Sequence, residues 1–154
     1  MSPFFQFEAD FVASLRCIPM QVRLKLDTCG IKLKLPQWQR LSPEERLQLV
    51  VMPCETEPEI QAYRETLQHW IQTYMGEPAT ELAIDAHPAW LDSHSIPPEV
   101  QAKAQSLNHP LTLASWAKLT PPQRFALIKL SRSNHENHNF LPALQEFGLV
   151  AWQA

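Results

Sequence analysis

The sequence contains few glycines and few cysteines, and these shortages argue against several classes of protein. Three widely separated glycines among 154 residues cannot form the glycine-rich loops that bind phosphate groups. Three cysteines, Cys17, Cys29 and Cys54, form neither an even set nor a Cys-x-x-Cys pair. This pattern does not fit a disulfide scaffold, and it predicts a reducing, cytoplasmic location.

Long apolar runs and a strong excess of one charge are also missing. Apolar residues occur in short runs broken by charge or proline, so no membrane span is predicted. The N-terminal sequence MSPFFQFEADF lacks the features of a secretory signal. The formal net charge of −3 gives no overall attraction to nucleic acid or to an anionic membrane. A soluble protein with neither of these partners is therefore expected.

The residues that are present are sufficient for a folded core. A hydrophobic fraction of 45% and a charged fraction of 19% are ordinary for a globular protein. The length fits one compact domain, residues 1–154. Fourteen prolines favour short helices joined by stiff connections.

An internal duplication is the strongest feature of the sequence. When the chain is shifted by 78 residues, residues 18–52 lie over residues 96–130 without a gap, and eleven of the 35 pairs are identical. Typical residue frequencies would give about two or three identities. The identical pairs are Ile18/Ile96, Pro19/Pro97, Val22/Val100, Lys25/Lys103, Leu33/Leu111, Leu35/Leu113, Trp38/Trp116, Leu41/Leu119, Pro43/Pro121, Arg46/Arg124 and Leu49/Leu127. Most are apolar or begin a helix, so the duplication describes architecture.

Helix-start signals repeat at the same offset. The segments SPEE at residues 42–45 and TPPQ at residues 120–123 each place a hydroxyl cap, a proline and a carboxylate or amide in the order of a capping box. Residues 57–75 predict the longest helix, between the two copies, and residues 77–95 predict a linker. Alternating residues 31–35 are the one place where local strand pairing is expected. The predicted fold is all-α, a compact bundle of short helices built on the duplication, with one longer central helix.

Basic residues are concentrated near the start of the chain. From residue 16 to residue 40 there are six basic residues and one acid, whereas residues 41–100 contain eleven acids and two basic residues. A basic segment of this kind can bind an acidic partner. Trp90 lies in the predicted linker, where a large aromatic side chain anchors either the loop or a partner. The predicted partner-binding residues are Arg16, Arg23, Lys25, Lys32, Lys34 and Trp90.

Cysteine and histidine residues offer a less favoured metal site. The candidate ligands are Cys17, Cys29, Cys54, His135 and His138. Their spacing matches no common zinc or iron–sulfur motif, and free cysteine usually packs as a small hydrophobe. No nucleophile elbow is present either. We therefore predict no catalytic residue, no enzymatic activity and no cofactor.

Three long segments resemble the cyanobacterial nitrate-reductase-associated protein family. They are FEADFVASLRCIPMQVRLKLDTCGIKLKL, HPAWLD and QRFALIKLSRSNHENHNFLPALQEFGL, and the resemblance extends from about Phe5 to Leu149. It implies an accessory or maturation role for a cytoplasmic assimilatory nitrate reductase, an enzyme with a molybdenum–pterin cofactor and an iron–sulfur cluster. The family offers no catalytic residues to transfer.

Three functions stay open under this resemblance. The protein is an assembly factor that binds nitrate reductase as its client, a carrier of a metal, an iron–sulfur cluster or a pterin, or a regulatory subunit of the mature reductase. The first is preferred because the candidate metal ligands match no motif well. The basic segment is the surface that we expect to contact an acidic client face.

Overall fold

Helices make up most of the described chain, and the prediction of a mainly α-helical protein is confirmed. The computed structural model describes residues 4–12, 14–132 and 137–150. The chain divides into two compact units, Met1–Asp85 and Ala86–Ala154. Each unit has its own buried residues. No helix in the described residues is long and apolar enough to cross a membrane.

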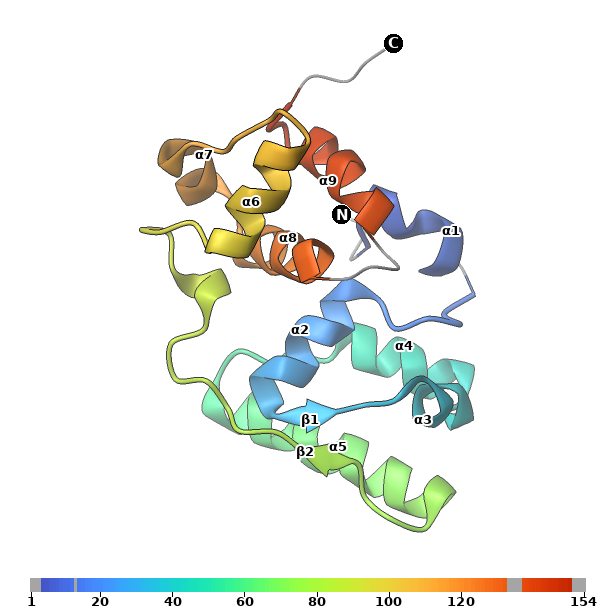
Figure 1. Ribbon diagram of the computed structural model, residues 1–154. Helices are drawn as coiled ribbons and strands as arrows, with labels where there is room; N and C mark the ends of the chain where they lie inside the picture. Colours follow the sequence, from blue (N-terminus) through green and yellow to red (C-terminus); the bar gives the residue numbers. More distant parts are fainter. Residues whose placement is uncertain (1–3, 13, 133–136, 151–154) are drawn as a thin grey trace. The chain divides into compact units, whose positions relative to one another are not determined.

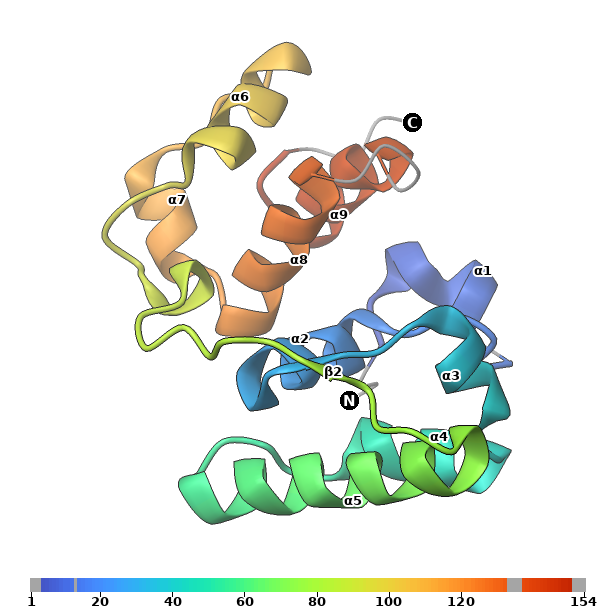
Figure 2. The ribbon, with the colours of Figure 1, turned by 60° about the horizontal axis from the view of Figure 1, so that its bottom comes forward.

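The first unit is built from short helices and one long helix (Figure 1). Its elements are η1 (Gln6–Glu8), α1 (Ala9–Val12), α2 (Met20–Cys29), β1 (Ile31–Lys32), α3 (Leu35–Arg40), α4 (Pro43–Val51), α5 (Glu57–Met75) and β2 (Thr80–Glu81). The long helix α5 packs against α2 and α3 (Figure 2). The buried core of the unit includes Trp38, Leu49, Tyr63, Leu67 and Ile71.

The helix starts follow the capping signals of the sequence. The Ser42 hydroxyl accepts from the Glu45 backbone N–H at 3.1 Å, and the Glu45 carboxylate accepts from the Ser42 N–H at 2.8 Å. Thr56 and Glu59 form the same reciprocal pair at the start of α5. Each pair satisfies backbone donors that a helix cannot bond internally, so these starts are fixed locally.

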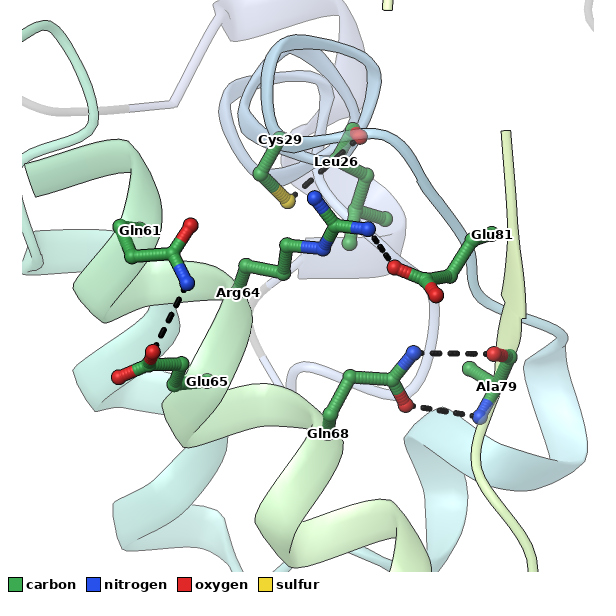
Figure 3. A network of polar contacts seen from close by, with 8 residues as sticks. All are labelled: Leu26, Cys29, Gln61, Arg64, Glu65, Gln68, Ala79 and Glu81. Carbon is green, nitrogen blue, oxygen red and sulfur yellow. Dashed lines mark hydrogen bonds and ion pairs between the residues drawn. The ribbon is translucent and has the colours of Figure 1, made fainter. Parts of the chain in front are cut away.

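The strand partner of β1 differs from the expected local pairing. β1 pairs antiparallel with β2, which lies within the segment predicted as a linker, and Ile31 faces Glu81 in the register. Side chains of α5 hold the β2 segment (Figure 3). The Gln68 amide donates to the Ala79 carbonyl at 2.9 Å and accepts from the Ala79 N–H at 2.8 Å, while Arg64 forms an ion pair with Glu81. The tertiary contacts of α5 therefore fix a pairing that no local pattern encodes.

The second unit is arranged around helix α8. Its elements are η2 (Ala89–Leu91), α6 (Pro98–Ser106), α7 (Leu113–Lys118), α8 (Pro121–Arg132), η3 (Asn137–Asn139) and α9 (Phe140–Glu146). Helix α8 packs against α6, α9, η2 and η3. Its side chains from Arg124 to Ile128 are all buried, as is Leu130. Such a helix is apolar around most of its circumference because neighbours cover it on several sides.

Residues paired at the 78-residue offset occupy similar places in the two units. Trp38 and Trp116 are both fully buried, and each indole N–H donates to a backbone carbonyl, that of Leu15 at 2.8 Å and that of Asp92 at 3.0 Å. Gly30, which follows α2, and Asn108, which follows α6, are also paired at this offset. Both have a positive φ, 77° and 64°, so the two residues share a left-handed backbone conformation. The duplication itself stays a prediction from the sequence.

Candidate functional site

Lys25 lies inside the first unit, so the structure corrects its assignment to a partner-binding surface. The side chain is only 9% exposed. Its ammonium group donates to the carbonyls of Val50 at 2.7 Å and Met52 at 2.6 Å, at the C-terminal end of α4. Burial lowers the pKa of Lys25, and nearby Cys54 and Glu55 partly oppose that shift. The residue therefore satisfies helix-end carbonyls, which ties α2 to α4.

Lys32 and Lys34 are the members of the predicted basic segment that lie side by side on the surface. β1 and the residue after it alternate, with Ile31 buried and Leu33 packed against the core. Lys32 and Lys34 are exposed. Because successive side chains of an extended chain point to opposite faces, both ammonium groups extend outward. We call Lys32 and Lys34 the lysine ridge.

The other predicted cations are placed differently. Arg16 is exposed and lies between α1 and α2. Arg23 is half-buried, and its guanidinium donates to the Ile18 carbonyl at 3.3 Å. The five predicted partner-binding cations therefore comprise one buried residue, one half-buried residue bonded to the backbone, and three exposed residues.

Trp90 anchors the η2 turn to α8. Its ring meets the ring of Phe125 edge-on, with centroids 5.1 Å apart and an interplanar angle of 87°. The Arg124 guanidinium donates from Nε to the Trp90 carbonyl at 2.8 Å. Trp90 is half-buried. Of the two roles considered for this aromatic side chain, the structure shows loop anchoring.

The three cysteines are distributed between the core and its edge. Cys17 is half-buried, whereas Cys29 and Cys54 are buried. Burial raises the pKa of Cys29 to about 12 and that of Cys54 to about 11. Because the thiolate is both the nucleophile and the metal ligand, these two side chains are poorly suited to either role.

Of the two histidine candidates, only His138 lies among the described residues. His138 is exposed in η3, and His135 lies outside the described residues. Among residues 4–12, 14–132 and 137–150, no group of three or more His, Cys, Asp or Glu side chains could hold a metal ion. The ligands predicted from the sequence are therefore not brought together in the part of the chain that the structure describes.

An exposed apolar pair on α4 is a feature that the sequence reasoning missed. Leu47 is 53% exposed and Val51 is 66% exposed. They are four residues apart, so they share one face of the helix, opposite the side that carries buried Leu49. The signal available in the sequence was the presence of apolar residues on both sides of one short helix. Surface residues of this kind suit protein contacts.

The described part of the chain is mainly helical, and its exposed features include the lysine ridge and the apolar pair on α4. The chain belongs to the family of conserved nitrate reductase-associated proteins, whose family model matches residues 4–147. Searches among curated proteins and among solved structures found no match.

Proposed function

We propose that this protein is a non-catalytic accessory protein that binds a cytoplasmic assimilatory nitrate reductase and assists its maturation. The family match over residues 4–147 is the observation that carries the association with nitrate reductase. The placement of the cysteines supports binding rather than catalysis or cofactor transport, because Cys29 and Cys54 are buried with raised pKa values.

The lysine ridge is the surface that we assign to the reductase. Lys32 and Lys34 are exposed on a segment whose backbone is held by β2 and whose intervening side chain, Leu33, packs against the core. Leu35, 43% exposed, follows directly and adds apolar area. A pair of fixed cations beside an apolar side chain matches an acidic patch on a partner, where complementary charge speeds association and sets orientation.

Affinity capture from native cells grown on nitrate tests both the function and the surface. The tagged full-length protein is used as bait, and retained proteins are identified by mass spectrometry. We expect nitrate reductase to be recovered, most strongly when its cofactor supply is blocked and the apo-enzyme accumulates. Capture of the mature enzyme alone would instead make the protein a regulatory subunit. Capture of no reductase in either state, with the tag accessible, would contradict the proposed function.

Charge reversal locates the contact. In the double variant Lys32→Glu and Lys34→Glu we expect capture to fall about tenfold at low salt, and the difference from wild type to shrink as salt screens the charges. Lys118→Glu, at an exposed position in α7, is the control for a change of surface charge. If the double variant captures as much reductase as Lys118→Glu does, the lysine ridge is not the interface.

A further inference from the structure

The outer face of α4 carries two exposed apolar side chains, Leu47 and Val51. It consists of Glu44, Leu47, Gln48 and Val51, all of them exposed and spaced three or four residues apart on the helix. We call these four residues the α4 outer face. The opposite side of the helix buries Leu49 in the core of the first unit, so the outer face is not needed for that core.

The second unit shows how the equivalent helix face is covered. At the 78-residue offset Leu47 corresponds to Phe125, which is only 1% exposed. Trp90 of the η2 turn lies edge-on against its ring. Arg124, the residue before Phe125, fixes the turn by donating to the Trp90 carbonyl. The Trp90 ring and the Trp90 carbonyl thus hold the η2 turn against α8.

The equivalent arginine of the first unit has other partners. Arg46 donates from Nε to the Trp38 carbonyl at 3.2 Å and from Nη2 to the Gln39 carbonyl at 2.8 Å. In the second unit Arg124 reaches the corresponding Trp116 carbonyl through Nη1 at 3.5 Å, which leaves Nε for Trp90. The same rotation of the Arg46 guanidinium would present Nε to a carbonyl placed beside Leu47.

The two helices share their start and one core position. Ser42 and Thr120 both cap their helices, and Leu49 and Leu127 are both fully buried. They differ in their neighbours: α8 packs against η2 as well as α6, α9 and η3, whereas Leu47 and Val51 stay exposed on α4. If α4 and α8 are equivalent, as the predicted duplication implies, a turn like η2 is the kind of group that fits the α4 outer face.

We propose that the α4 outer face binds a short helical turn of a protein partner that carries an aromatic side chain. The aromatic ring packs on Leu47 and Val51 as Trp90 packs on Phe125, and the carbonyl of that turn accepts a hydrogen bond from Arg46. Glu44 at the edge of the face favours a basic residue beside the aromatic one. The turn belongs to nitrate reductase, and this identification of the partner rests on the proposed function. A second copy of this chain fits less well, because its own Trp90 is already held by Phe125 and Arg124.

A peptide tests the chemistry of the face without the reductase. The probe has the sequence of residues 86–95 with one lysine added at each end, and the full-length protein is observed by NMR at roughly millimolar peptide. We expect chemical-shift changes centred on Leu47, Gln48 and Val51. They should be largely lost with a control peptide in which alanine replaces the residue equivalent to Trp90, and with the protein variant Leu47→Lys. If the aromatic peptide causes no changes at these positions, the inference is overturned.

A matched pair of variants tests whether the reductase is the partner. Leu47→Lys and Leu113→Lys change leucines that are 53% and 50% exposed, one on the α4 outer face and one on α7. We expect Leu47→Lys to reduce capture of nitrate reductase about tenfold, as loss of a central apolar anchor does, and Leu113→Lys to retain it. Equal capture by both variants would overturn the assignment of this face to the reductase.

The two experiments separate failure of the inference from failure of the proposed function. Peptide binding at the α4 outer face together with no capture of reductase by the wild type would contradict the proposed function and leave the binding chemistry of the face supported. Suppose instead that Leu47→Lys captures as much reductase as the wild type and that the peptide does not bind. This result would overturn the inference and leave the proposed function supported. Sedimentation that shows a dimer lost in Leu47→Lys would identify a second copy as the occupant and overturn the choice of partner.

Discussion

Cys29 and Cys54 illustrate how burial changes the chemistry of a residue. Burial is the largest cause of the rise in pKa for both thiols, to about 12 and about 11. The Cys29 thiol donates to the Leu26 carbonyl at 3.7 Å, and the Cys54 thiol donates to the Lys25 carbonyl at 3.8 Å. A thiol that stays protonated at neutral pH packs as an apolar group. The spacing of the cysteines in the sequence indicates the same role.

Thiol labelling should therefore distinguish the three cysteines. At pH 8 in the folded protein we expect a thiol-specific disulfide reagent to modify half-buried Cys17 first. A pKa of about 12 leaves Cys29 with a thiolate fraction on the order of one in ten thousand at that pH. Because the pKa values are raised, the thiolate fractions of Cys29 and Cys54 should increase about tenfold for each pH unit below those values. Peptide mapping by mass spectrometry measures each site.

The variant Cys17→Ala is the control for this labelling. In the folded variant we expect almost no modification at neutral pH, and in denaturant two thiols should react at ordinary rates. Rapid labelling of Cys29 or Cys54 in the folded variant, at the rate seen in denaturant, would contradict their burial in a stable core.

Lys25 shows why one residue of the predicted surface was misassigned. In the sequence it is one of several cations in a basic segment, and lysine is usually exposed. Its acceptors, the carbonyls of Val50 and Met52, lie on a helix end far along the chain. No pattern near Lys25 reports that contact, because it depends on how α2 packs against α4.

The contact between α2 and the β2 segment depends on Gly30, which ends α2 with φ of 77°. A Cβ atom at Gly30 would lie 2.7 Å from the Leu82 carbonyl oxygen and 2.9 Å from Cγ1 of Ile84. For Gly30→Ala we expect a loss of about 1–2 kcal/mol in the free energy of unfolding from the left-handed backbone, and a further loss from displacing the β2 segment. Chemical denaturation measures the sum.

Gly76→Ala is the matched control for Gly30→Ala. Gly76 ends α5 with φ of 79°, and a Cβ atom at this position would have no neighbour within 4 Å. This variant should carry the backbone strain alone. If Gly30→Ala is no more destabilising than Gly76→Ala, the close approach of the β2 segment contributes nothing to stability.

Helix starts were predictable and the small sheet was not, for a physical reason. The capping pairs of Ser42 with Glu45, and of Thr56 with Glu59, are formed by residues three apart, so sequence spacing alone identifies them. β2 is two residues long, and such a strand has too few residues to show alternation. Its position is set by Gln68, which binds the backbone of Ala79 from α5.

The duplication predicted from the sequence allows the candidate surfaces of the two units to be compared residue by residue. The paired tryptophans, the paired helix caps and the equivalent residues Gly30 and Asn108 have similar structural roles in the two units. The units differ where function is proposed, since the lysine ridge has no basic counterparts at positions 110 and 112, which are Pro110 and Thr112. If the two units are copies, unequal surface charge allows one partner to bind in one orientation.

The boundary between the two compact units should be the first site of proteolysis. The units divide after Asp85, and residues 80–87 are all exposed. β2 pairs with β1, and the Leu82 N–H donates to the Gly30 carbonyl at 2.8 Å, so the backbone up to Leu82 is held. With a low concentration of a non-specific protease we therefore expect the first cleavage within residues 83–87, because exposed connections are cut before packed helices.

Both fragments should then resist further digestion, because each unit buries its own apolar residues, around Tyr63 and Ile71 in the first and around Leu127 and Phe140 in the second. Mass spectrometry of the early products locates the cut, and circular dichroism of the digest measures the retained helix. In Gly30→Ala the cut should extend to residues 80–82 and occur faster, since the β2 segment is displaced. First cleavages inside α5 or α8 would show that the helices open more readily than the segment that joins the units, contrary to the division of the chain at Asp85.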